Sequence, residues 1–301
     1  MSAPRAGFTD AAVKHARKQD IQADVVVLRA IRSHWPEYVI EAFCLASFML
    51  SAAAFATALQ HPASPWLLQT MPAFLSRLPM GAAMGLTAIA IIYSPFGRRS
   101  GAHMNPALTL AFLRLGKIGG IDAFFYVLAQ FSGGVSGIVV ATWLLRGLPA
   151  DPSVNYVATM PGPDGAAIAF AAEALISFGL MTAVLHWSNR PRLAPYTGML
   201  AGGLVMAYIT VEAPLSGMSM NPARSFGPAL LAGSFESFWI YVAAPLMGML
   251  AAAELYVRRR GLAHVLCAKL HHGDGPCIFD CQFGVPKGPP MASRSVTEVS
   301  A

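Results

Sequence analysis

Residues 100–110 read SGAHMNPALTL, and residues 216–226 read SGMSMNPARSF. The two stretches share the frame Ser-Gly-x-x-Met-Asn-Pro-Ala. Each leads into a short apolar run, 105–114 in the first case and 221–231 in the second. These runs are only about half as long as the roughly 20 residues that a helix needs to cross a bilayer. The repeat therefore predicts two short helices that cannot span a membrane alone.

The composition indicates a membrane protein. Apolar residues make up 55% of the 301 residues, charged residues only 12%, and the mean hydropathy is +0.52. A soluble domain carries about 25% charged residues, so this chain has too little charge to face water on all sides. An ordinary soluble enzyme, a disordered chain and a nucleic-acid-binding protein are therefore excluded.

Six other apolar segments approach the length of a full crossing. They are expected at about 37–59, 79–96, 121–145, 166–187, 195–212 and 236–257. Polar tails are expected on either side, over 1–36 and 258–301. The region 37–257 then forms one membrane domain with two halves, 37–145 and 166–257.

The distribution of Lys and Arg predicts the orientation of this domain. If the N-terminus is cytoplasmic, all but three of the 21 Lys and Arg residues fall on the cytoplasmic side. The exceptions are Arg77, Arg146 and Arg224. This bias follows the positive-inside rule, so both tails are expected in the cytoplasm, at the plasma membrane. It also accounts for the net charge of +6 without a nucleic-acid partner.

The two halves are related as an inverted repeat. Each carries a glutamate in its first span, Glu41 and Glu173, and an Asn-Pro-Ala box after its second span. Because three spans is an odd number, the second half enters the membrane from the opposite side. The two short helices should therefore meet tip to tip near the midplane.

The meeting point has a chemistry that follows from its helix ends. Proline fits the first turn of a helix, and the asparagine before it can cap the helix while its NH2 group points outward. Each helix N-terminus carries about half a positive charge. Such a site orients water or a hydroxyl group and repels cations and protons.

On these features the chain resembles the aquaporin, or major intrinsic protein, family over about 37–257. The resemblance rests on two boxes, which comprise Asn105, Pro106, Ala107, Asn221, Pro222 and Ala223. It implies an all-α membrane protein, a right-handed bundle of six helices with two re-entrant half-helices. It also implies a homotetramer with one pore per subunit, which passes water and small uncharged solutes, excludes ions, and has no enzymatic activity.

The family's second constriction implies a set of selectivity residues. Its arginine is Arg224, directly after the second box, and its partners by family spacing are Met218 in the loop and Ile209 in the fifth span. The position in the second span is Met84 by alignment of a Gly-Leu pair, or Gly85 by counting back from the first box. Ile209 offers no hydrogen bond and Met side chains are adaptable, so this constriction should be less polar than in strict water channels.

Neighbouring residues leave the solute class open. Ser225, Ala229 and Tyr241 are similar to the water-channel subgroup, whereas Val242 departs from it. A facilitator for glycerol or small polyols is therefore the alternative function. A non-conducting structural membrane protein is a more distant alternative.

The buried acidic residues and the first-box histidine have two interpretations each. Glu41 and Glu173 could serve a secondary active transporter, but the resemblance implies that they accept backbone hydrogen bonds behind the re-entrant loops. His103 could sense pH, but it is expected to support the first box by packing. Arg224 could also be an arginine that extends to the membrane interface.

The C-terminal tail carries a further candidate site. Residues 267–281 read CAKLHHGDGPCIFDC. The candidate zinc ligands are Cys267, His271 (or His272), Cys277 and Cys281. Three thiolates and one imidazole suit a tetrahedral zinc ion, and the cytosol would keep the thiols reduced. The alternative is a polar tail with incidental cysteines and no cofactor.

Overall fold

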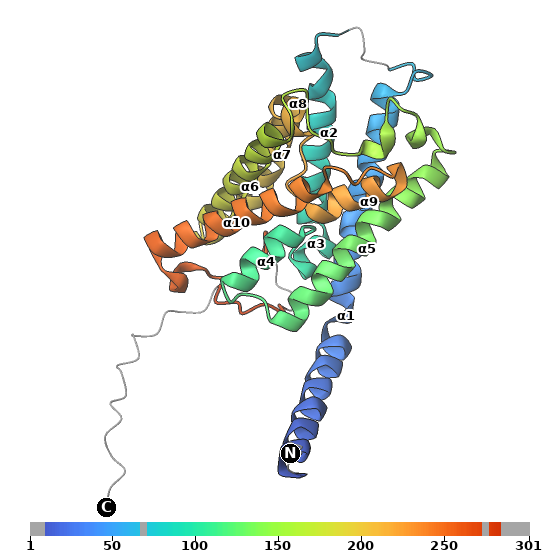
Figure 1. The fold of residues 1–301 in the computed structure, drawn as a ribbon. Coiled ribbons are helices and arrows are strands. Elements are labelled where there is room, and N and C mark those ends of the chain that lie inside the picture. Colours follow the sequence, from blue (N-terminus) through green and yellow to red (C-terminus); the bar gives the residue numbers. More distant parts are fainter. Residues whose placement is uncertain (1–9, 67–70, 273–276, 284–301) are drawn as a thin grey trace, which may run out of the picture.

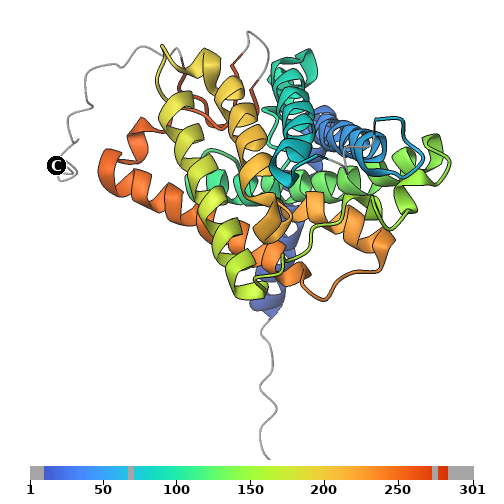
Figure 2. The ribbon, with the colours of Figure 1, turned by 90° about the horizontal axis from the view of Figure 1, so that it is seen from above.

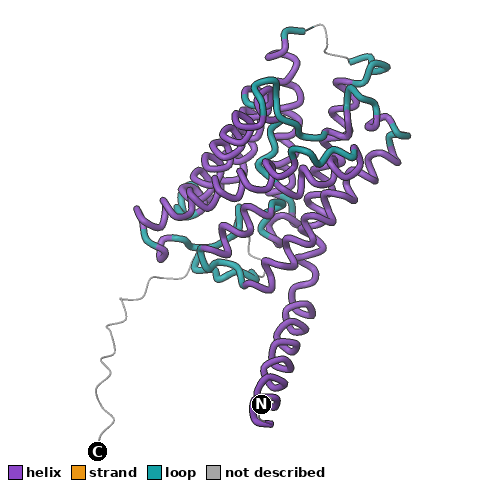
Figure 3. Tube along the Cα trace, in the orientation of Figure 1, coloured by secondary structure: helices purple, strands orange, loops and turns teal. Residues whose placement is uncertain are grey.

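The computed structural model describes residues 10–66, 71–272 and 277–283, with side chains from Val25 onward. Residues 1–9 and 284–301, which belong to the expected tails, lie outside the described residues. Every regular element within the described ranges is helical (Figure 3). The predicted all-α class is therefore confirmed.

Six helices are long and apolar enough to cross a membrane. They lie in α1 (Asp10–Gln60), α2 (Ala73–Tyr93), α5 (Gly120–Leu144), α6 (Ala166–Ser188), α7 (Thr197–Val211) and α10 (Phe238–Arg260) (Figure 1). The first span covers Val25–Gln60 of α1, and the fifth covers Ala194–Val211, the 3-10 turn before α7 included. Large apolar side chains lie on their outer faces; Leu86, Trp143 and Leu175 are 65%, 77% and 70% exposed. This surface suits lipid rather than water, and the six expected spans are confirmed.

Shorter helices lie between these spans. They are α3 (Pro95–Ser100), α4 (Pro106–Arg114), α8 (Ala213–Ser216) and α9 (Pro222–Ala232), with 3-10 turns η1 (Leu148–Ala150), η2 (Asn155–Val157), η3 (Ala194–Tyr196) and η4 (Leu262–His264). Both half-length helices, α4 and α9, begin at the proline of an Asn-Pro-Ala box, as predicted. Proline is favoured there because the first turn needs no N–H donor.

The packing of the helices follows the inverted repeat. Helix α1 packs along α5, α6 packs along α10, and α2 packs against α7 to join the two halves. Figure 2 shows α1 and α5 on one side of the bundle and α6 and α7 on the other. The half-helices cross between halves, because α4 packs on α10 and α9 packs on α5. Each half therefore holds the re-entrant helix of the other.

Helix α1 is longer than the first expected span. Its 51 residues correspond to about 76 Å at a rise of 1.5 Å per residue, more than twice the thickness of a hydrocarbon core. The N-terminal part projects beyond the bundle (Figure 1). The hydropathy of the sequence predicted where the apolar stretch lies but not where the helix begins. The helix extends from the apolar stretch toward the N-terminus, past Pro36 and into the polar region.

Part of the expected C-terminal tail packs back on the protein. We call residues 262–272 and 277–283 the C-terminal segment. The Leu266 amide donates to Oδ1 of Asn189 (2.7 Å), and the Gln282 amide donates to the Leu266 carbonyl (2.7 Å). The Asp280 amide donates to the Lys117 carbonyl, which lies after α4 (3.1 Å). The segment is thus tied to itself and to both halves of the bundle.

Close backbone approach explains the small residues of α5. A Cβ atom added at Gly133 would lie 2.2 Å from the Ala42 carbonyl oxygen of α1, and one at Gly137 would lie 2.5 Å from that of Ala46. These distances are far shorter than any real carbon contact. The pair Gly133 and Gly137 therefore lets α1 and α5 pack backbone to backbone.

We expect Gly133→Ala to destabilise the bundle by about 1–3 kcal/mol, because the new methyl group must push α1 away from α5. The matched control is Gly203→Ala on α7, where an added Cβ meets nothing within 4 Å. That variant should keep or slightly raise stability, since alanine is the better helix former. Thermal unfolding in detergent measures both; equal midpoints for the two variants would contradict the packing argument.

Candidate functional site

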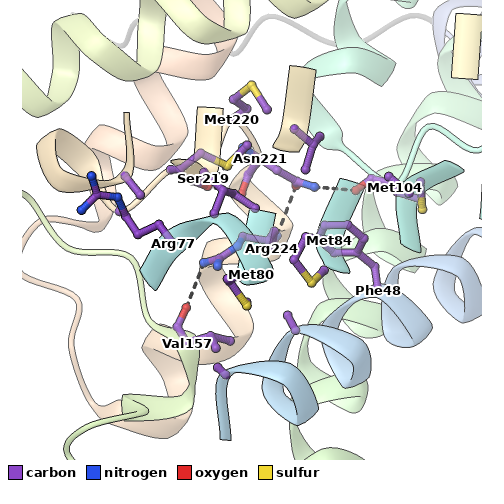
Figure 4. A pocket seen from close by; sticks show the side chains of 18 of the residues that line it. Phe48, Arg77, Met80, Met84, Met104, Val157, Ser219, Met220, Asn221 and Arg224 are labelled. Atoms are coloured by element: carbon purple, nitrogen blue, oxygen red, sulfur yellow. Dashed lines mark hydrogen bonds between the residues drawn. The ribbon is translucent and has the colours of Figure 1, made fainter. Parts of the chain in front are cut away.

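The two Asn-Pro-Ala loops contact each other at the centre of the bundle. Nδ2 of Asn105 donates to the Met220 carbonyl (2.7 Å), and Nδ2 of Asn221 donates to the Met104 carbonyl (2.6 Å) (Figure 4). Each box is thus bonded to the residue that precedes the asparagine of the other box. The half-helices meet tip to tip, as the inverted repeat predicted.

Each asparagine also caps its own half-helix. Oδ1 of Asn105 accepts from the Ala107 amide (2.9 Å), and Oδ1 of Asn221 accepts from the amides of Ala223 (3.1 Å) and Arg224 (3.2 Å). These bonds fix the orientation of both amide groups. Because an NH2 group has two hydrogens and the loop-to-loop bond uses one, each asparagine retains a second donor.

Glu41 of α1 holds the first loop from behind. Its carboxylate accepts from the amides of His103 (2.9 Å) and Met104 (2.7 Å), from the Ser100 hydroxyl (2.8 Å) and from the Gln130 side-chain amide (3.1 Å). Glu41 is fully buried. A carboxylate is an acceptor with about four sites, so it satisfies several loop donors at once.

Glu173 of α6 repeats this arrangement in the second loop. Its carboxylate accepts from the amides of Ser219 (2.6 Å) and Met220 (2.7 Å) and from the Ser216 hydroxyl (2.7 Å), and it too is fully buried. A tyrosine of the same half adds a further bond, from Tyr241 to the Ser216 carbonyl (2.7 Å). The two loops are thus built to the same plan.

The loops hold an unusual backbone conformation that requires this support. Ala102 and Met104 in the first loop have φ of 54° and 49°, and Met218 and Met220 in the second have φ of 53° and 56°. Left-handed conformations of non-glycine residues cost about 1–3 kcal/mol each. They persist here because the buried glutamates bind the loop amides.

A cavity of about 630 Å³ lies at this centre. Its wall includes Met71 and Ser153 near one end of the bundle, both box asparagines, and Leu270 of the C-terminal segment at the other end. Asn105 and Asn221 therefore lie on the wall of a cavity whose lining extends from the Met71 end of the bundle to Leu270.

Arg224 lies on the wall of the same cavity. Nη1 of its guanidinium donates to the Val157 carbonyl (2.9 Å) (Figure 4), which orients the side chain. The expected partners Met218 and Ile209 also line the cavity. These three residues thus line one cavity.

The structure distinguishes the two candidates in the second span. Met84 lines the cavity, and Gly85 is absent from the described lining. A Cβ atom at Gly85 would lie 2.6 Å from the Gly202 carbonyl oxygen, so Gly85 is the point where α2 approaches α7. Consecutive helical residues point about 100° apart, which is why a one-residue ambiguity changes the face.

His103 belongs to the cavity lining, but it is buried and tightly packed. Its ring stacks on Phe112 at 5.3 Å and on Phe279 of the C-terminal segment at 5.2 Å. Nδ1 pairs with the Thr109 hydroxyl (3.0 Å) and Nε2 with the Ala268 carbonyl (2.9 Å). Both ring nitrogens have partners in a buried site, which suits a structural role.

Some lining residues were missed in the sequence. Met80 lies four residues before Met84 and so on the same helix face, and this spacing could have identified it. Arg77 lines the cavity one turn earlier, with Nε donating to the Thr210 carbonyl (2.9 Å). Leu270 had no such signal, because a polar tail has no periodicity that reports where it folds back.

The three cysteines of the tail lie together, but His271 does not join them. The Sγ atoms of Cys267, Cys277 and Cys281 all lie within 4.8 Å of one another. The ring of His271 instead contacts that of Tyr93 at 4.6 Å. The expectation that His271 completes a four-ligand set is therefore wrong, because the chain turns its ring toward α2.

His272, the other candidate imidazole, is not in the group either. Its ring stacks on Phe283 at 4.2 Å. Burial, with the nearby Lys269 charge, lowers the pKa of His272 to about 4, so the ring is neutral at physiological pH. The cluster of thiols thus consists of three cysteines, Cys267, Cys277 and Cys281, all from the C-terminal segment.

Comparison with known proteins agrees with this architecture. The family described as "Major intrinsic protein" matches residues 30–256. "Aquaporin NIP1-3" of Oryza sativa subsp. japonica is 36% identical over 174 residues, which is 57% of this chain and 58% of the relative. "Aquaporin NIP1-1" of Arabidopsis thaliana is 37% identical over 177 residues, 57% of this chain and 59% of the relative. The chain thus spans about three fifths of these relatives.

A solved structure shows the same fold. The aquaglyceroporin from Plasmodium falciparum superimposes with a TM-score of 0.60 at 19% sequence identity. The match covers 74% of this chain and 95% of the other. At this identity the likeness concerns the fold, which the two chains share across most of the bundle.

Proposed function

The chain belongs to the major intrinsic protein family, and on this premise we propose that it is a passive channel for water and small uncharged solutes, including glycerol. The observation that carries the proposal is the pair of asparagine amides, Asn105 and Asn221, on the wall of one cavity whose lining extends from Met71 to Leu270. The names of the relatives and of the solved structure support the same solute range.

The two amides act as a fixed pair of donors at the narrow centre. A water molecule or hydroxyl group that passes gives its lone pairs to the free N–H bonds of Asn105 and Asn221, and so loses hydrogen bonds to its neighbours in the file. The N-termini of α4 and α9 add a positive potential. Among the described lining residues, no carboxylate offsets it.

We propose that the constriction outside this centre selects solutes by one charged and three apolar side chains. Arg224 and the Val157 carbonyl offer polar contacts to hydroxyl groups, and Met84, Ile209 and Met218 offer apolar contacts to a carbon skeleton. Such a surface suits a polyol, which has a polar edge and an apolar edge. It also passes water.

The glutamates argue against an ion-coupled transporter. Glu41 and Glu173 are fully buried, are absent from the described cavity wall, and bind loop amides and hydroxyls. A proton-coupled carboxylate must exchange protons with a pathway. We therefore assign them the role of holding the loops.

We further propose the arrangement in the cell. A channel domain at 37–257 lies in the plasma membrane with the tails 1–36 and 258–301 in the cytoplasm, as the Lys and Arg distribution favours. We propose a homotetramer in which each chain has its own pore, as the family resemblance implies. The protein itself is multi-pass, with six apolar helices in its described part.

Stopped-flow light scattering of proteoliposomes tests the function. Under an osmotic gradient of an impermeant sugar, vesicles with the protein should shrink at least about tenfold faster than empty vesicles, because a pore removes the cost of dissolving water in lipid. Under a glycerol gradient they should then re-swell faster than empty vesicles. Rates equal to those of empty vesicles in both gradients would contradict the proposal, and glycerol flux without water flux would support the polyol facilitator instead.

A further inference from the structure

The C-terminal segment carries a group of thiols that the proposed channel does not use. Cys267 lies on its first part, and Cys277 and Cys281 lie on its second part. Their Sγ atoms all lie within 4.8 Å of one another, and those of Cys267 and Cys277 are 3.7 Å apart. We propose that these three thiolates bind one thiophilic metal ion, for which Zn²⁺ is the probe.

The spacing suits such an ion. With Zn–S bonds of about 2.3 Å and tetrahedral angles, two thiolates of one site lie about 3.8 Å apart. The distance of 3.7 Å between the Sγ atoms of Cys267 and Cys277 matches this expected sulfur–sulfur distance. Cys281 is within 4.8 Å of both, so a small side-chain rotation brings it to the same distance.

The number and exposure of the ligands define the kind of site. Cys267 is buried, whereas Cys277 and Cys281 are half-buried, so the fourth position of a tetrahedron faces solvent and takes a water molecule. Three protein ligands with one open position is a known zinc arrangement. Thiolates select soft ions and exclude Mg²⁺ and Ca²⁺, which prefer oxygen.

The charge of the surroundings also fits. Three thiolates and one divalent cation carry a net charge of −1. The ammonium group of Lys269 is buried, with the residue 1% exposed, and its charge acts on Cys277. A positive group at this place offsets the excess negative charge of the loaded site.

The bound ion would join the two parts of the segment at the inner end of the cavity. The Leu270 amide donates to the Gly101 carbonyl of the first re-entrant loop (3.2 Å), and Leu270 lines the cavity. Phe279 on the second part stacks on His103. A metal at Cys267, Cys277 and Cys281 therefore fixes the elements that form the cavity wall next to Leu270.

The test is metal binding to the full-length protein in detergent, with a non-thiol reductant present. After loading with Zn²⁺ and removal of excess, elemental analysis should give about one Zn²⁺ per chain. The double variant Cys277→Ser/Cys281→Ser should hold less than about a fifth of that, because hydroxyls are poor zinc ligands. Mg²⁺ in large excess should not displace the ion.

Cys44→Ser is the matched control, since Cys44 is buried in α1 and lies outside the group. It should keep about one Zn²⁺ per chain. Co²⁺ in place of Zn²⁺ gives a second readout: its thiolate charge-transfer absorption should fall stepwise in Cys281→Ser and in the double variant. Size-exclusion profiles show that the variants remain folded.

Three results would overturn the proposal. These are zinc retained by the double variant, zinc lost by Cys44→Ser, and wild-type protein that holds no more zinc than the double variant. If Cys267 and Cys277 only form a disulfide in air, the reduced wild-type protein will hold no more zinc than the double variant, which is the third of these results. Because binding is measured in detergent, its failure is independent of whether the protein conducts water or glycerol.

Discussion

Glu173→Leu is expected to prevent the protein from folding into a stable bundle. Leucine has a similar volume but no acceptor, so the amides of Ser219 and Met220 and the Ser216 hydroxyl lose their buried partner. Each buried donor left unsatisfied costs about 1–3 kcal/mol, and more when its partner was charged. The sum, about 3–9 kcal/mol, is comparable with the whole stability of a typical domain, about 5–15 kcal/mol.

Two further effects act in the same direction. The second loop holds Met218 and Met220 at positive φ, and without the carboxylate nothing offsets that strain. The charge of Arg224 acts on Glu173. Removal of the carboxylate therefore leaves the half-buried guanidinium of Arg224 without that compensating negative charge. The expected result is aggregated protein or a strongly lowered unfolding midpoint.

The measurement is size-exclusion chromatography and thermal unfolding in detergent. Glu173→Gln keeps one acceptor but points an NH2 group at a loop amide, so its midpoint should lie between those of wild type and Glu173→Leu. The control is Glu254→Gln on α10, where a partly exposed carboxylate pairs with Arg114 and Arg258. Such pairs contribute about 0–1 kcal/mol. A monodisperse Glu173→Leu protein with a wild-type midpoint would refute the role given to this glutamate.

The fold was predictable from local sequence signals. Six apolar runs of spanning length, two half-length runs after Asn-Pro-Ala and the repeated glutamate determine the spans and their inverted order. Each signal is contained in a short stretch, and the bilayer sets its length. The meeting of Asn105 and Asn221 follows from topology alone.

The position of the C-terminal segment was not predictable in the same way. The place of Leu270 in the cavity wall depends on contacts with Gly101, and the stack of Phe279 on His103 joins residues far apart in the chain. The tail is polar and has no periodic pattern, so only tertiary packing determines where it lies. The position of His271 against Tyr93 is the same kind of effect, since sequence spacing does not report side-chain direction.

Arg224→Ala is expected to let cations and protons through the channel and to raise glycerol flux. The guanidinium is oriented by the Val157 carbonyl on the cavity wall. A unit charge at about 4 Å opposes a passing cation by about 4 kcal/mol at an effective dielectric constant of 20. The asparagine pair and the half-helix N-termini remain, so we expect an ion leak at least about tenfold above wild type rather than an open pore.

The same substitution should widen the proposed constriction, because alanine removes a long side chain from the wall of the cavity that Met84 and Ile209 also line. Glycerol flux should therefore rise several-fold more than water flux. Arg77→Ala is the matched control, since Arg77 is an arginine that lines the same cavity but donates to the Thr210 carbonyl on α7 instead of the Val157 carbonyl. A pH-sensitive dye inside proteoliposomes measures the proton leak, and light scattering measures the solutes. If both arginine variants leak equally, Arg224 has no special place in charge exclusion. If neither variant leaks, the barrier lies at the half-helix ends alone.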